Sequence, residues 1–207
     1  MGEITGISWT RSTFNPWQGC TKIGPGCDHC YAESADQRFH KEIHWGAGAP
    51  RKTMSESTWN NPLRWNREAA KTGEFWPVFC ASPADVFDNE ADPALRARLF
   101  KLIRSTPHLT WQLLTKRIGN VIDMLPDDWG AGYPNVWLGA TFVNQDELNR
   151  DYRKLVATQA VKRFASNEPM LGAINLKRID VGNLKEIDAL TAAEYLTGGE
   201  KLKLVKN

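Results

Sequence analysis

Short apolar runs alternate with amphipathic stretches along most of the chain, a pattern typical of an α/β fold. Four of these runs are bounded by polar turns, as the buried strands of a parallel sheet are. They are residues 75–82, 111–115, 136–141 and 161–166. A run at 4–9 and a weaker one at 195–197 extend the prediction to about six strands.

The stretches between these runs have the periodicity of amphipathic helices. Asp92 fits the cap and Pro93 the first position of one helix, which Pro107 ends. Asn144 fits the cap of another helix. The residues predicted to face inward in three helices are Leu95, Leu99, Leu102 and Ile103; Ile118, Val121, Ile122 and Leu125; and Leu148, Tyr152, Leu155 and Val156.

Two further segments complete the predicted organisation. A helix that starts near Cys30 would place Tyr31, Ala35 and Phe39 inward. Residues 44–71 have no clear period and hold several Trp among Gly, Pro, Asn and Arg, so we expect a long ordered loop there. No low-complexity tract or linker divides the chain, and the sequence therefore predicts one domain over residues 1–207.

The composition is that of an ordinary globular protein. Hydrophobic residues make up 42% and charged residues 24% of the chain, which argues against a disordered protein. The net charge of +2 argues against a protein built around one basic field, although nucleic acid is kept as a substrate class. The apolar runs are too short to span a bilayer and residues 1–5 lack a secretory pattern, so we expect a cytoplasmic protein without a membrane partner.

Three of the four cysteines lie within eleven residues of one another. Cys20, Cys27 and Cys30 have the spacing Cys-x6-Cys-x2-Cys, and a Gly-Pro-Gly segment between them lets the backbone bend tightly. In a reducing compartment, clustered cysteines favour metal or redox chemistry over disulfides. We therefore predict that these three cysteines bind metal.

Three thiolates leave the kind of metal open. A four-iron, four-sulfur cluster would keep one iron free for a small molecule. Zinc would need a fourth ligand such as His29 or His44, or an open position for water. Three unrelated buried thiols are the remaining interpretation. Cys80 lies inside an apolar run and is predicted to be a buried, inert thiol, with a fourth metal ligand as the alternative.

Hydrogen-bonding or charged side chains follow each predicted strand. Because ligands bind at the carboxyl ends of parallel strands, we expect these side chains to share one polar mouth. Lys116, in preference to Arg117, would bind a carboxylate or phosphate, and Asp85 would either hold ribose hydroxyls or cap a turn. The candidate cofactor-binding or substrate-binding residues are Ser82, Asp85, Thr115, Lys116, Thr141, Asn167 and Glu168.

Eight short segments between residues 7 and 172 match the motifs of one known family. They are SWT at 8–10, TFNPW at 13–17, the cysteine stretch ending in CYAE at 30–33, PLRWN at 62–66, ADVFD at 84–88, LLTKR at 113–117, VWLG at 136–139 and EPMLG at 168–172. In these segments the chain resembles the phage-associated three-cysteine-motif proteins, a family regarded as related to radical S-adenosylmethionine enzymes.

The resemblance implies a partial (β/α) barrel of parallel strands, similar to a TIM barrel, with a 4Fe-4S cluster on Cys20, Cys27 and Cys30 at its mouth. It further implies S-adenosyl-L-methionine as a second cofactor, radical chemistry, an electron donor protein, and the host cytoplasm as the compartment of a phage-encoded chain. By association with phage biology, we expect a nucleotide or nucleic acid as substrate.

Two features depart from that pattern. The first cysteine gap has six residues, where three is commonest among radical enzymes, and residues 175–207 form a divergent or truncated end. The alternative function is a non-enzymatic binding module for a protein or nucleic-acid partner, in which zinc or an iron–sulfur cluster is a structural staple. A zinc hydrolase with an open coordination position ranks last, because catalytic zinc sites more often use His and carboxylate ligands.

Overall fold

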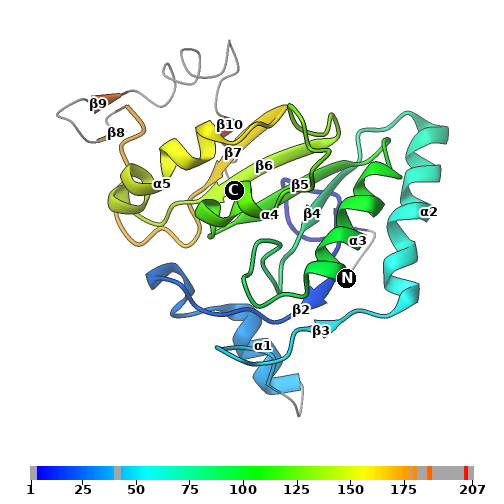
Figure 1. The fold of residues 1–207 in the computed structure, drawn as a ribbon, viewed down its shortest axis with the longest axis horizontal. Coiled ribbons are helices and arrows are strands. Elements are labelled where there is room, and N and C mark those ends of the chain that lie inside the picture. Colours follow the sequence, from blue (N-terminus) through cyan, green and yellow to red (C-terminus); the bar gives the residue numbers. More distant parts are fainter. Residues whose placement is uncertain (1–3, 40–42, 178, 181–185, 188–202, 205–207) are drawn as a thin grey trace.

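The computed structural model describes residues 4–39, 43–177, 179–180, 186–187 and 203–204 (Figure 1). The helices are α1 (Tyr31–Phe39), α2 (Glu56–Thr72), α3 (Pro93–Arg104), α4 (Val121–Met124) and α5 (Gln145–Ala157), with 3-10 turns η1 (Pro25–Cys27) and η2 (Ile118–Asn120). The strands are β1 (Ser12–Thr13), β2 (Trp17–Gln18), β3 (Lys52–Thr53), β4 (Pro77–Cys80), β5 (Thr110–Thr115), β6 (Val136–Thr141), β7 (Lys162–Ser166), β8 (Ile179–Asp180), β9 (Glu186–Ile187) and β10 (Lys203–Leu204).

One parallel sheet organises the fold. Its strand order is β1-β4-β5-β6-β7-β10, and every pair of neighbours in it is parallel. The strands lie in the sheet in the same order as in the chain. Each new strand of the sheet therefore pairs with the strand of the sheet that precedes it in sequence. The predicted α/β class is therefore confirmed, as are the four buried strands predicted within residues 75–166.

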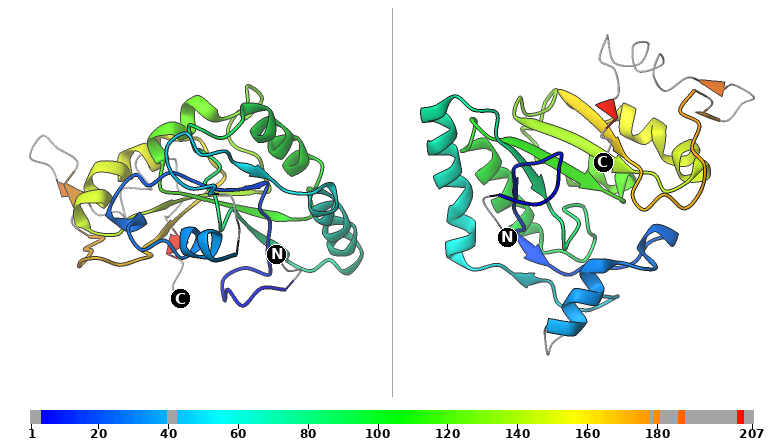
Figure 2. Two further views of the ribbon diagram at one scale, coloured as in Figure 1. Left: turned by 90° about the horizontal axis from the view of Figure 1, so that it is seen from below. Right: turned by 180° about the vertical axis from the view of Figure 1, so that it is seen from behind.

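The two faces of the sheet are covered differently. Helices α3, α4 and α5 lie over one face, while the N-terminal segment runs across the other face (Figure 2). On this second face the Trp9 ring centroid lies 4.8 Å from that of Phe79 and 6.4 Å from that of Phe164. Because successive strand residues point to opposite faces, Trp111 and Leu113 face the helices instead, where both are fully buried.

The prediction of a strand at residues 4–9 is wrong. The first strand is β1, and pairing starts where Arg11 N donates to the Pro77 carbonyl at 3.2 Å. The Thr10 hydroxyl donates to the same carbonyl at 3.2 Å, so the chain joins the sheet only at this point. The predicted strand at 195–197 lies outside the described residues.

Residues 44–71 are not one long loop, because α2 begins at Glu56. The Ser55 hydroxyl caps the helix by accepting from Thr58 N. Trp59, Trp65 and Ala69 are buried along one side of the helix. Pro62 concealed this stripe in the sequence, because proline normally breaks a helix interior. Residues 44–55 do remain largely irregular.

Two predicted helix faces also need correction. In α1, Tyr31, Ala35 and Phe39 are exposed, whereas Ala32 and Asp36 are buried. The Asp36 carboxylate accepts from the His44 backbone N at 2.9 Å, and this polar contact rather than an apolar face turns the helix inward. At 118–125 the chain forms η2 and the single turn α4, which leaves Ile122 59% exposed.

The caps predicted for the other two helices are confirmed. Asp92 accepts from Ala94 N at 2.8 Å at the start of α3, and Asn144 accepts from Glu147 N at 2.9 Å at the start of α5. Throughout the described part of the chain, every helix is too short or too polar to cross a bilayer.

Gly139 lies where the sheet cannot hold a side chain. A Cβ atom at this position would overlap the Phe164 ring on the neighbouring strand. We expect Gly139→Ala to lower the free energy of unfolding by about 1–3 kcal/mol, because overpacking displaces the ring. Urea denaturation measures the loss, with Gly6→Ala as the control, since nothing lies within 4 Å of its added methyl. Equal stability of the two variants would contradict this packing.

Candidate functional site

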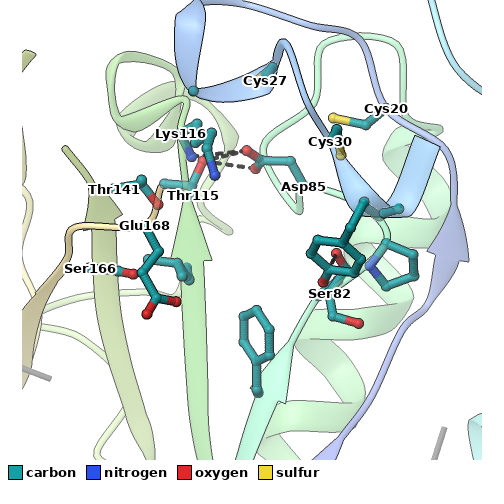
Figure 3. A pocket seen from close by; sticks show the side chains of 18 of the residues that line it. Cys20, Cys27, Cys30, Ser82, Asp85, Thr115, Lys116, Thr141, Ser166 and Glu168 are labelled. Carbon is teal, nitrogen blue, oxygen red and sulfur yellow. Dashed lines mark hydrogen bonds between the residues drawn. The ribbon is translucent and has the colours of Figure 1, made fainter. Parts of the chain in front are cut away.

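A pocket of about 990 Å³ lies at the carboxyl ends of the parallel strands (Figure 3). Its volume is at the upper end of the range of about 300–1,000 Å³ for small-molecule sites. The predicted site residues that line it are Cys20, Cys27, Cys30, Ser82, Asp85, Thr115, Lys116, Thr141 and Glu168. The structure thus brings residues from five separate segments to one cavity.

The cysteine loop is held against the mouth of this pocket. Gly19 N donates to the Pro83 carbonyl at 3.0 Å, and Gly46 N donates to the Cys20 carbonyl at 2.9 Å. Gly19 has φ of 111°, and a Cβ atom there would overlap the His44 carbonyl. The close approach of these two backbone segments therefore requires glycine, and it fixes where Cys20 enters the pocket.

The three thiols line one pocket but are not gathered around one point. Among the described residues, no three His, Cys, Asp or Glu side chains form a group that could hold one metal ion. A zinc ion needs all its sulfurs about 2.3 Å from one centre. The ligands of a four-iron cluster bind different irons and lie farther apart. Cys20, Cys27 and Cys30 all line the pocket, so they are the residues that would hold such a cluster.

The histidines proposed as a fourth zinc ligand are placed differently. His44 is buried, and its Nδ1 lies 2.8 Å from Asp36 Oδ1, which engages one ring nitrogen. His29 lines the pocket beside Cys30. Cys80 is fully buried within β4, as predicted for an inert thiol, and burial raises its pKa.

The thiol of Cys20 lies in a partly buried environment that also contains charged side chains. Burial raises the pKa of its thiol to about 11, while the guanidinium of Arg117 opposes part of that rise. The free thiol is therefore protonated at neutral pH. Metal binding at Cys20 must displace this proton, because only the thiolate is a ligand.

Asp85 organises the ends of two strands. Its carboxylate accepts from the Thr115 hydroxyl at 2.8 and 2.9 Å, from Lys116 N at 3.1 Å and from Phe87 N at 3.0 Å. The contact with Phe87 N is the turn-capping alternative that the sequence left open. The Thr115 hydroxyl donates to this carboxylate and accepts from Arg117 N. The Asp85 carboxylate and the Thr115 hydroxyl therefore both have hydrogen-bond partners within the protein.

Lys116 and Thr141 present polar atoms to the pocket. Within the described residues, Lys116 has no ion pair, and its stem passes beside Gly26 of the cysteine loop. Among the described residues, Thr141 Oγ1 is buried without a hydrogen-bond partner, so it is a candidate to bind a polar atom of a ligand. Asn167 Oδ1 is likewise buried without a partner, but Asn167 does not line the pocket.

Sequence reasoning ranked Lys116 above Arg117 and missed Arg117's contact with a cysteine. Arg117 is 7% exposed, and its Nη1 donates to Cys20 Sγ at 3.2 Å. Trp9 and Tyr31 were also missed as pocket residues. The Tyr31 hydroxyl donates to the Ser82 carbonyl at 3.1 Å, which links α1 to the end of β4.

Fold and site together define an α/β protein whose cysteine-lined pocket opens at the carboxyl ends of a parallel sheet. The chain belongs to a family of proteins of unknown function, DUF5131, which it matches over residues 4–201. No curated protein and no solved structure matches it.

Proposed function

We propose that this protein is an iron–sulfur, S-adenosylmethionine-dependent radical enzyme of phage origin. One observation carries the proposal: Cys20, Cys27 and Cys30 line the same pocket as the polar ends of β4, β5, β6 and β7. A metal centre and a small-molecule site in one cavity fit an enzyme better than a protein with a structural metal site, because a structural site needs no cavity beside it.

The sheet supports the fold that this proposal requires. Its strands follow one another in chain order, with α3, α4 and α5 on a single face (Figure 1). Repeated strand–helix units of this kind close into (β/α) barrels, whose active sites lie at the carboxyl ends of the strands. We therefore propose a partial barrel of the TIM-like, radical-enzyme type.

Each part of the pocket has a role in the proposed reaction. Cys20, Cys27 and Cys30 would hold the cluster. In radical enzymes of this type, the bound cluster supplies the electron that splits the sulfonium of S-adenosylmethionine and so starts hydrogen abstraction. Lys116 would bind a carboxylate or phosphate, and the Thr141 hydroxyl would bind a second polar group of the ligand.

Aromatic residues complete the cavity. Trp9 and Tyr31 line it, and aromatic rings both exclude water and stack on bases. Their presence supports a nucleotide or nucleic acid as substrate. The reaction would take place in the host cytoplasm, with a separate protein as electron donor.

Electron paramagnetic resonance of the anaerobically reconstituted, reduced protein tests this proposal. We expect a cluster signal whose shape changes when S-adenosylmethionine is added, because the cofactor would bind at the open iron. S-adenosylhomocysteine, which lacks the sulfonium and therefore cannot be cleaved there, serves as the control ligand. A protein that binds one zinc and no cluster would overturn the proposal in favour of a metal-stapled binding module.

A further inference from the structure

We infer that Arg117 raises the reduction potential of the cluster by donating a hydrogen bond to the ligand Cys20. This inference rests on the proposed function, since it concerns the cluster that the three cysteines would hold. Arg117 is here a positioning and tuning residue, because it acts on a ligand of the cluster and not on a substrate.

The guanidinium of Arg117, which follows the end of β5, contacts the cysteine loop. Its Nη1 lies 3.2 Å from Cys20 Sγ, and its Nη2 donates to the Thr21 carbonyl. The two contacts hold the sulfur and the adjoining backbone with one planar group. Arg117 is 7% exposed, so water competes little for these hydrogen bonds.

Two carboxylates fix the guanidinium in this position. Nη1 lies 3.3 Å from Asp85 Oδ2, and Nη2 lies 3.7 Å from Asp88 Oδ1. Arg117 N donates to the Thr115 hydroxyl at 2.8 Å, which anchors its backbone to the end of β5. The Arg117 guanidinium is therefore held by partners within the protein. We assign ligand binding to Lys116 instead.

A second arginine, Arg51, binds the carboxylate of Asp88. The buried side chain of Arg51 donates to Asp88 Oδ2 at 2.7 Å and to the Thr21 hydroxyl at 2.6 Å. Asp88 thus lies between two guanidiniums, close to Cys20 but without a contact to its sulfur. Arg117 and Asp88 therefore form a pair of opposite charges close to Cys20.

The sign of the effect follows from electrostatics. One-electron reduction adds a negative charge to the cluster and its thiolates. A hydrogen-bond donor with a positive charge at Cys20 Sγ stabilises the reduced state and raises the potential. The carboxylate of Asp88 acts in the opposite direction. Removal of either group disturbs the same buried network, yet the two changes must shift the potential oppositely.

Redox titration of the reconstituted protein, followed by electron paramagnetic resonance, separates these effects. We expect Arg117→Gln to move the midpoint potential to a more negative value, and Asp88→Asn to a more positive one. Arg117→Lys keeps the charge without the planar pair of donors, so its potential should lie between wild type and Arg117→Gln. Iron and sulfide contents verify that each variant holds a complete cluster.

The outcomes distinguish this inference from the proposed function. A wild-type protein that binds no cluster overturns both. A loaded Arg117→Gln with an unchanged potential overturns the role of Arg117 alone. Shifts in the same direction for Arg117→Gln and Asp88→Asn would show general disturbance of the network and also contradict it. Failure of both Arg117 variants to load a cluster that wild type holds would make Arg117 structural.

Discussion

We expect Cys27→Ala to abolish binding of the iron–sulfur cluster. The proposed cluster has only three protein ligands, so the loss of one leaves two irons without a thiolate. Cys20→Ala and Cys30→Ala should have the same effect. The measurement is iron and acid-labile sulfide per chain after anaerobic reconstitution, which should fall from about four of each to near background.

Cys80→Ala is the matched control for this experiment. It removes the fourth cysteine of the chain, which is fully buried in β4 and does not line the pocket. This variant should keep the wild-type iron and sulfide contents. Cys27 is only partly buried in the turn η1, so its replacement should leave the circular dichroism spectrum unchanged. A complete cluster in Cys27→Ala would overturn the assignment.

The sequence predicted the main strands because their environment leaves a strong local pattern. A parallel strand with both faces covered reads as a short, mostly apolar run, and β4, β5 and β6 are such runs. Helix α2 left a weaker pattern. Its buried stripe includes Pro62, so the periodic positions Trp59, Trp65 and Ala69 were hidden by a residue that usually ends a helix.

The site was predictable only where neighbours in sequence carry it. The spacing of Cys20, Cys27 and Cys30 indicated one site, and all three line the pocket. By contrast, Arg117 and Cys20 are 97 positions apart, and no local pattern encodes a contact between them. The inward face of α1 was mispredicted for a similar reason, since the carboxylate of Asp36 binds a residue outside the helix.

The second large effect concerns stability. We expect Asp85→Ala to lower the free energy of unfolding of the cluster-free protein by about 3–5 kcal/mol, because it leaves the buried charge of Arg117 without its nearer carboxylate. It also removes the acceptor for the Thr115 hydroxyl and for the backbone N of Phe87 and Lys116. Urea denaturation at constant pH gives the difference.

Two companion variants make this measurement specific. Asp127→Ala removes an exposed aspartate and should change stability by less than about 0.5 kcal/mol. Asp85→Asn keeps an acceptor oxygen but not the charge. Its free energy of unfolding should therefore lie between those of wild type and Asp85→Ala. If Asp85→Ala were as stable as Asp127→Ala, the carboxylate would not organise the strand ends.

The double variant Asp85→Ala/Arg117→Gln tests whether the two residues act as a pair. Each single change leaves the partner's charge buried and uncompensated, whereas the double change removes both charges. Its loss of stability should therefore be smaller than the sum of the two single losses, with a coupling of about 0.5–3 kcal/mol. Strict additivity would mean that the 3.3 Å contact between Asp85 and Arg117 contributes nothing to holding the guanidinium at Cys20.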